Sequence, residues 1–262
     1  MFQDTWRALK ALRSRFRTQR ERMARLEGFS ANVAHELRTP LATLITGTEL
    51  SLREGGLPPP AQERLGAHLE ELRRLSGIVD DMLFLAQARG GQRARREPVD
   101  SLALLAREVA SFHEAAIDEA GLTLRVDGDG GGDFDAPLLR RALSNLIDNA
   151  ARYATPGSAI RVAIEALGRG RMRLSVLNEG AEIPPDRLPR LFDRFYRADA
   201  PRERPGEHHG LGLSIVAAIA RMHGGAPFAR SGPGGTRIGL TLSGARRPSA
   251  YTARRSPTAA PP

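Results

Sequence analysis

The chain has 262 residues, no cysteine and a formal net charge of +9. This length allows a hydrophobic core for one or two domains without disulfides. The lack of cysteine excludes a thiolate nucleophile and a cysteine-built zinc or iron–sulfur site. Neither a secretory signal nor an apolar run near the ~20 residues of a membrane span is visible. We therefore expect a cytoplasmic protein, or the cytosolic part of an inner-membrane protein if a segment precedes it.

The positive charge is concentrated at the two ends of the chain. Residues 1–28 carry a net charge of +5 and residues 244–262 a net charge of +4, so residues 29–243 are formally neutral. A nucleic-acid-binding domain typically carries a basic patch on its folded body. The charge distribution therefore predicts that nucleic acid is not a partner.

The first predicted element, residues 1–28, is a basic amphipathic helix or short coiled coil. One interpretation is a signal-delivering extension of a dimer helix. The other is an anchor lying on an anionic membrane. Its apolar side chains recur at three-, four- and seven-residue steps: Phe2, Trp6, Leu9, Leu12, Phe16, Met23 and Leu26.

The helix is predicted to continue through residues 29–53 with two distinct faces. Helical spacing places four polar side chains on one face: Asn32, His35, Glu36 and Thr39. An apolar stripe opposes them: Phe29, Val33, Leu37, Leu41 and Leu44. The His35 imidazole is then directed toward solvent, where Glu36 can take up its proton. Pro40 removes an N–H and is expected to bend the helix.

The run His35-Glu36-Leu37-Arg38-Thr39-Pro40 resembles the phosphoacceptor box of sensor histidine kinases. The resemblance implies that His35 accepts a phosphoryl group and that Glu36 assists as its base. It also implies that Thr39 positions water for a reverse phosphatase step.

A second helix is predicted from about 61 to 88, after a break rich in glycine and proline at residues 55–60. Its apolar positions are Leu65, Leu69, Leu72, Leu75, Val79, Met82 and Leu85. Two such helices form an antiparallel hairpin that buries little surface alone. We therefore expect two copies to pair into a four-helix bundle, so that residues 29–89 form a dimerisation and phosphotransfer domain, and the family resemblance supports this homodimer.

Residues 90–98 are predicted to be a flexible linker, residues 99–243 a second domain, and residues 244–262 a disordered tail. The second domain mixes helices and strands in the manner of an α+β sandwich, with one helical layer over a mostly antiparallel sheet. Helices are expected near 101–120, 137–153 and 211–223, and strands near 123–126, 160–166, 171–177 and 236–242.

The helix near 137–153 carries four side chains suited to a nucleotide on one side: Asn145, Asn149, Arg152 and Tyr153. A carboxamide oxygen suits Mg²⁺, a guanidinium suits phosphate and an aromatic ring can cover adenine. The run Asn145-Leu146-Ile147-Asp148-Asn149-Ala150 resembles the N box of the ATP-binding domain shared by histidine kinases, gyrase and a chaperone family. In that family the second asparagine holds magnesium and the first helps to position the phosphates. The resemblance thus implies ATP and Mg²⁺ as cofactors.

The run Asn178-Glu179-Gly180-Ala181-Glu182-Ile183-Pro184 occupies the place of that family's adenine-reading loop. Asn178 replaces the usual aspartate and Glu182 the second glycine. An asparagine oxygen still accepts a hydrogen bond from the adenine amino group, but without the strengthening charge. The Asn-x-Gly-x-x-Ile-Pro form resembles the heavy-metal-sensor branch of the family.

Three further runs resemble the rest of this ATP-binding domain. Residues 191–197 match the F box, whose aromatics anchor a lid, and residues 198–209 are polar as a lid would be. Gly210 and Gly212 open a helix whose N–H groups can approach phosphate. Residues 234–236 fit the final glycine turn. Together the resemblances cover roughly residues 29–243.

These patterns predict a two-component sensor histidine kinase that autophosphorylates on His35 and transfers the phosphoryl group to a response regulator. An alternative is a phosphotransfer scaffold whose altered adenine loop no longer binds ATP usefully. An ATP-driven clamp or a protein-serine kinase leaves His35-Glu36 and the helical hairpin unexplained. Membrane association is expected only through an upstream segment or the basic N-terminal helix.

Overall fold

The computed structural model describes residues 34, 36–197 and 209–244. It divides into two compact units, residues 1–90 and 91–262, and each is described by itself. The N-terminal helix predicted for residues 1–28 and the tail from residue 245 lie outside the described residues. None of the helices in the described ranges is long and apolar enough to cross a bilayer.

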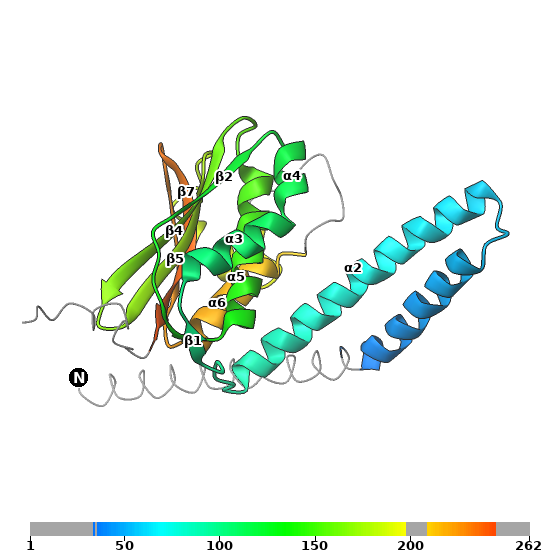
Figure 1. Ribbon diagram of the computed structural model, residues 1–262, viewed down its shortest axis with the longest axis horizontal. Coiled ribbons are helices and arrows are strands. Elements are labelled where there is room, and N and C mark those ends of the chain that lie inside the picture. Colours follow the sequence, from blue (N-terminus) through cyan, green and yellow to red (C-terminus); the bar gives the residue numbers. More distant parts are fainter. Residues whose placement is uncertain (1–33, 35, 198–208, 245–262) are drawn as a thin grey trace, which may run out of the picture. The chain divides into compact units, whose positions relative to one another are not determined.

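The first unit is an antiparallel hairpin of two helices (Figure 1). Residues 36–54 form the first helix, which continues through Pro40, and α2 spans Pro59–Arg89. Proline at the first two positions of α2 suits a helix start, where the missing N–H would have no helical partner. Ion pairs cross the hairpin from Arg38 to Asp80 at 2.5 Å and from Arg73 to Glu49 at 2.6 Å.

The hairpin buries only part of its predicted apolar stripes. Ala34, Val79 and Leu83 are buried together, with Leu41 and Met82 packed against them. Other leucines that the pattern assigned to the apolar face are exposed within one chain: Leu37, Leu44 and Leu75. A single hairpin therefore leaves a substantial apolar surface without a cover.

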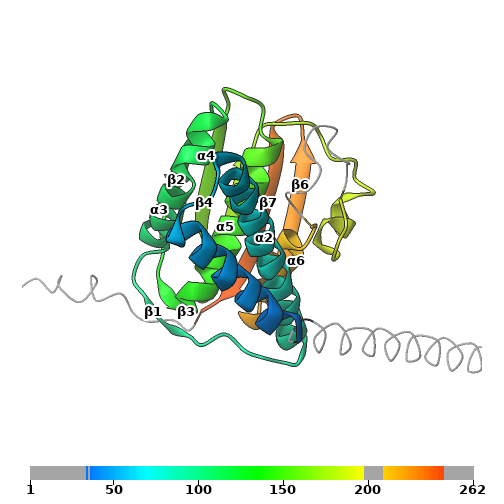
Figure 2. The same cartoon turned by 90° about the vertical axis from the view of Figure 1, so that its right-hand side faces the viewer.

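The second unit is a five-stranded sheet with helices on one side (Figure 1). The strand order is β2-β4-β5-β7-β6, which Figure 2 shows with β2 and β6 at opposite edges. The β2·β4 pair is parallel and the other three pairs are antiparallel. The strands span Thr123–Asp127, Ala159–Gly168, Arg171–Asn178, Gly235–Ser243 and Pro227–Gly232 in that order. This arrangement agrees with the predicted mostly antiparallel α+β sandwich.

The helical layer consists of α3 (Leu102–Phe112), α4 (Glu114–Glu119), α5 (Ala136–Tyr153) and α6 (Gly212–Met222). A short 3₁₀ helix, η1 (Leu188–Phe192), precedes the lid residues. Alternate strand residues pack against these helices because side chains alternate across a sheet. The core between the layers includes the fully buried Leu146, Leu174, Ile215 and Leu240.

The structure differs from the sequence-based expectation in three places. The predicted helix 101–120 breaks at His113, whose ring contacts α5 through Ser144 at 3.0 Å and Asp148 at 3.0 Å. The predicted linker ends in a strand, β1 (Glu97–Val99), which pairs with β3 (Gly132–Phe134), a strand that was not predicted. Strand β6 was not predicted. These features depend on contacts between distant segments, which local periodicity does not record.

Candidate functional site

The centre of the candidate nucleotide site is the polar face of α5. Asp135 caps the helix by accepting a hydrogen bond from the Leu138 N–H at 3.2 Å, and Pro137 occupies its first turn. The opposite face is anchored in the core by Leu139, Leu143 and Leu146. Asn145, Asn149 and Arg152 are partly exposed, and Tyr153 is 44% exposed. The helix therefore holds these side chains at the edge of the core.

The start of α6 lies directly against the first asparagine. A methyl group on Gly212 would come within 2.6 Å of the Asn145 Oδ1, so only a glycine leaves that oxygen in its place. The Asn145 Nδ2 donates to the Arg141 carbonyl at 2.8 Å, which fixes the orientation of the amide. Asn149 makes no side-chain hydrogen bond within the described ranges. Its carboxamide oxygen is thus available to a hard cation such as Mg²⁺.

The predicted adenine loop meets the C-terminal end of α5. Asn178 ends β5 and is only 4% exposed, and its Nδ2 donates to the Glu179 carbonyl at 3.2 Å. The Glu179 carbonyl also accepts the Thr155 N–H at 2.8 Å. A methyl group on Gly180 would approach the Tyr153 carbonyl to 2.2 Å. The loop and the helix end are therefore in direct backbone contact, and the Asn178 oxygen keeps its capacity to accept.

Two polar residues that were not predicted for the site support this loop from the neighbouring strands. Thr236 pairs in register with Asn178 and is 4% exposed. Its hydroxyl is 2.7 Å from the Ser231 Oγ, which accepts the Ile183 N–H at 2.9 Å. No sequence pattern marked Ser231, because β6 is only six residues long and begins and ends with proline and glycine, so no alternation is clear. Glu182, the second departure from the family loop, is exposed.

The two ends of the lid segment are joined by the backbone. The Phe195 N–H donates to the Gly210 carbonyl at 3.0 Å. Gly210 has φ +68° and a methyl group there would lie 2.9 Å from the Phe195 backbone. Phe195 itself is 59% exposed with φ +61°, so its backbone and not its ring forms this anchor. Residues 198–208 lie outside the described residues.

The predicted phosphoacceptor residues belong to the other unit. His35 lies outside the described residues. Glu36 and Thr39 are exposed on the first helix, and the Thr39 carbonyl accepts the Thr43 hydroxyl at 3.1 Å. The structure thus brings the predicted nucleotide residues together in one unit. Glu36 and Thr39, the two predicted catalytic residues that it describes, are open to solvent in the other.

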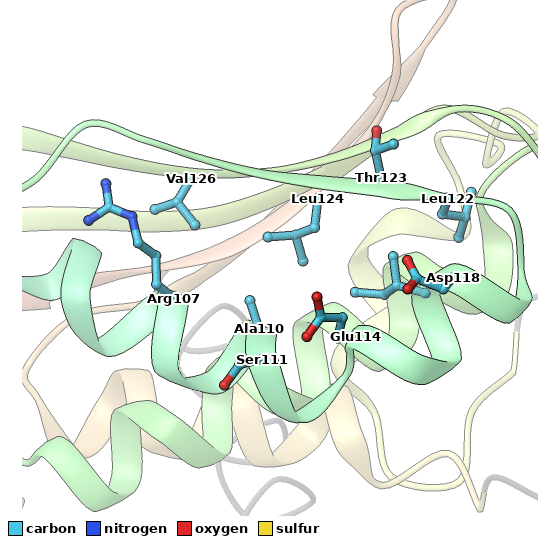
Figure 3. A pocket seen from close by; sticks show the side chains of 10 residues that line it. Arg107, Ala110, Ser111, Glu114, Asp118, Leu122, Thr123, Leu124 and Val126 are labelled. Carbon is cyan, nitrogen blue, oxygen red and sulfur yellow. The ribbon is translucent and has the colours of Figure 1, made fainter.

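A separate pocket of about 480 Å³ lies between α3, α4 and β2 (Figure 3). Leu124 and Val126 line it from the strand, while Arg107, Glu114 and Asp118 lie along the helices. None of its lining residues belongs to the predicted nucleotide site.

Two family models match the chain. Residues 25–91 match the His Kinase A (phospho-acceptor) domain, and residues 134–246 match the Histidine kinase-, DNA gyrase B-, and HSP90-like ATPase. The chain belongs to the sensor histidine kinase family. The expected family and its ATP-binding domain are thereby confirmed.

The curated relatives that this chain matches include members of the expected heavy-metal-sensor branch. The chain is 43% identical over 219 residues to sensor histidine kinase CusS of Escherichia coli K12, covering 83% of this chain and 45% of that protein. It is 40% identical over 202 residues to sensor protein CopS of Pseudomonas syringae pv. tomato, covering 76% and 41%. The chain thus spans less than half the length of these relatives.

Solved structures of histidine kinases share the fold. Full-length ShkA in complex with AMPPNP matches with a TM-score of 0.73 at 26% identity, over 83% of this chain and 46% of that one. Acinetobacter baumannii histidine kinase AdeS matches with a TM-score of 0.58 at 25% identity, over 80% and 97%.

Proposed function

We propose that this sensor histidine kinase uses ATP to phosphorylate its own His35 and then passes the phosphoryl group to an aspartate on a response regulator receiver domain. The observation that carries the proposal is the meeting of the Asn178–Gly180 loop and the Gly212 turn with the polar face of α5. This meeting occurs in a chain that also contains a phospho-acceptor domain.

The nucleotide unit would bind ATP through residues at both ends of this polar face. Asn178 would accept from the adenine amino group, with Gly180 allowing close approach and Tyr153 covering the ring. Asn145 and Arg152 would contact the phosphates, and N–H groups after Gly210 and Gly212 would add donors at a helix N-terminus. Asn149 would hold Mg²⁺, which neutralises charge on the phosphates when bound.

In the transfer step, a ring nitrogen of His35 forms a bond to the γ-phosphorus while the bond from that phosphorus to the β–γ bridging oxygen breaks. ADP leaves, and Glu36 takes the imidazole proton. Thr39 would position water for the reverse phosphatase reaction. Residues 29–89 would serve as the homodimeric phosphotransfer domain, with residues 99–243 as the ATP-binding domain, on the cytosolic side of the membrane if an upstream segment anchors the chain.

The direct test is incubation of the full chain with γ-labelled ATP and Mg²⁺. We expect a base-stable, acid-labile label that His35→Gln abolishes. His68→Gln is the matched control, because His68 is an exposed histidine on α2 of the same hairpin, and it should keep the label. A label that persists in His35→Gln would refute the assignment of the phosphoacceptor.

A second candidate function is a phosphotransfer scaffold that has lost useful ATP binding. The specific observation in its favour is the neutral Asn178 in place of a carboxylate. Isothermal titration with ADP and Mg²⁺ distinguishes the two functions, because absent or millimolar binding by a folded dimer would favour the scaffold.

A further inference from the structure

On the face of the sheet opposite the helices, one row of residues in register crosses all five strands, and four of its five residues are arginines. Arg125 on β2 pairs in register with Arg161 on β4, and Arg230 on β6 with Arg237 on β7. Leu177 on β5 completes the row between Arg161 and Arg237. We call these four arginines the arginine row. Neighbouring strands lie about 4.8 Å apart, so the cations are held close together.

The helices do not cover this face, because α3, α5 and α6 pack on the other side (Figure 1). Arg125, Arg161 and Arg230 are exposed and Arg237 is partly exposed. The next row contains Asp127, Ala163, Ser175, Gly239 and Phe228 in register. Its three small central residues, Ala163, Ser175 and Gly239, are buried, whereas the arginine side chains remain open to solvent in full or in part.

Carboxylates neutralise only half of the arginine row. Arg161 pairs with Asp127, and Arg237 pairs with Glu165 at 3.0 Å. Arg125 and Arg230 form no ion pair within the described part of the chain. Two further arginines, Arg171 and Arg173, lie on β5 on the same face of the sheet. The strand positions of this sheet face therefore carry six arginines against two carboxylates.

This arrangement has a cost in the isolated protein. Like charges directly opposite each other on neighbouring strands destabilise a sheet. The row contains two such pairs, Arg125 with Arg161 and Arg230 with Arg237. A bound polyanion would relieve both repulsions and would use the two arginines that lack carboxylate partners.

We propose that this face docks on an anionic lipid surface. Arginines attract anionic headgroups, which diffuse laterally and can collect beneath a fixed row of cations. Single-stranded nucleic acid fits less well, because proteins that bind single strands also need exposed aromatic rings on which bases stack. Phe228 is the one aromatic side chain on the strand positions of this face, and the Arg173 guanidinium already lies 5.5 Å from its ring centre.

The proposal is independent of the kinase chemistry, since no residue of the arginine row belongs to the proposed ATP site.

The test compares full-length variants in sedimentation with vesicles of phosphatidylcholine, alone or mixed with anionic phosphatidylglycerol. Arg125→Thr combined with Arg230→Thr removes two arginines without unpairing a carboxylate. The charge-matched control, Arg107→Gln with Arg140→Gln, removes the same charge from α3 and α5 on the helical side, although it also leaves Glu108 without its 2.7 Å ion pair to Arg140. Since each arginine near the surface contributes on the order of 1 kcal/mol, we expect the row variant to lower partitioning onto anionic vesicles about 10- to 30-fold.

The control should stay within about twofold of the parent, because its arginines lie on the opposite side of the sheet. The row variant should keep its autophosphorylation and should melt no lower than the parent, because repulsion is removed. Equal loss in both variants, or no loss in the row variant, would overturn the proposal. So would a row variant that loses binding to a single-stranded oligonucleotide while vesicle binding is unchanged, since the face would then serve nucleic acid.

Discussion

Individual contacts in the candidate site depend on the absence of side chains as much as on their presence. Gly180 and Gly212 each lie where a methyl group would collide, one with a backbone carbonyl and the other with an amide side chain. The collision at Gly180 cannot be relieved by a side-chain rotation, because the atom that it meets belongs to the backbone. The second falls on a side chain that could turn away, but only by giving up the position that the nucleotide site needs.

Gly180→Ala is expected to lower nucleotide affinity and stability together. The new methyl group must displace the Tyr153 carbonyl from 2.2 Å, and overpacking of this kind costs about 1–3 kcal/mol. Thermal melting and ADP titration measure the two effects. Gly232→Ala on β6 is the matched control, since a methyl group there meets nothing within 4 Å. Equal effects of the two substitutions would contradict the contact.

Gly212→Ala is expected to act through Asn145. The methyl group would press on the Asn145 Oδ1, so we expect ADP·Mg²⁺ affinity to fall about tenfold, with little change in melting temperature. In an Asn145→Ala background the same glycine substitution should cost much less, because the contacted oxygen is gone. Strictly additive losses in this double-mutant cycle would show that Gly212 acts by another route.

At the scale of elements, His223 joins three segments that are distant in sequence. It is fully buried at the end of α6, its Nδ1–H donates to the Ile219 carbonyl at 2.9 Å, and its Nε2 accepts the Asp135 N–H at 3.1 Å. Its own carbonyl accepts from Arg96 at 3.1 Å. The ring thereby ties the end of α6 to the start of α5, and the His223 carbonyl ties it to the segment before β1.

This junction is expected to weaken in acid. Burial lowers the pKa of His223, despite the opposing influence of the Ile219 carbonyl and of Asp135. In the unfolded chain the histidine pKa is about 6.5, so the unfolded chain binds the proton more readily than the folded one. The contribution of His223 to folding stability is therefore complete above that pH and is lost as the pH falls below it. Hydrogen exchange of α6, corrected for intrinsic rates, should show protection falling between about pH 7 and pH 5. His223→Gln should flatten the dependence, and an unchanged slope would remove His223 as its source.

At the scale of the whole molecule, the two units differ in how completely each buries its own apolar side chains. The sheet unit buries its own core, whereas the hairpin leaves Leu37, Leu44 and Leu50 exposed at 45%, 54% and 55%. A second hairpin can cover this stripe in a four-helix bundle. The apolar surface left by one hairpin is the physical reason to expect a homodimer.

Leu44→Asp is expected to convert the dimer to a monomer, because a carboxylate in a bundle core has no partner. Analytical ultracentrifugation measures the change. Leu104→Asp is the matched control, since Leu104 on α3 is 57% exposed in the other unit and its substitution should leave the dimer intact. A Leu44→Asp protein that stays dimeric would place the interface elsewhere.

Sequence by itself determined the features that short-range patterns encode. Helical periodicity predicted the hairpin and α5, and the spacing of Asn145 and Asn149 was enough to place both on one face of a helix. Tertiary structure decided what depends on contacts between distant segments. It revealed β1 and β6, the break at His113, the support of Ile183 by Ser231, and the arginine row. Arg125, Arg161, Arg237 and Arg230 are separated in the chain and become neighbours only through strand register, which the sequence of one strand does not contain.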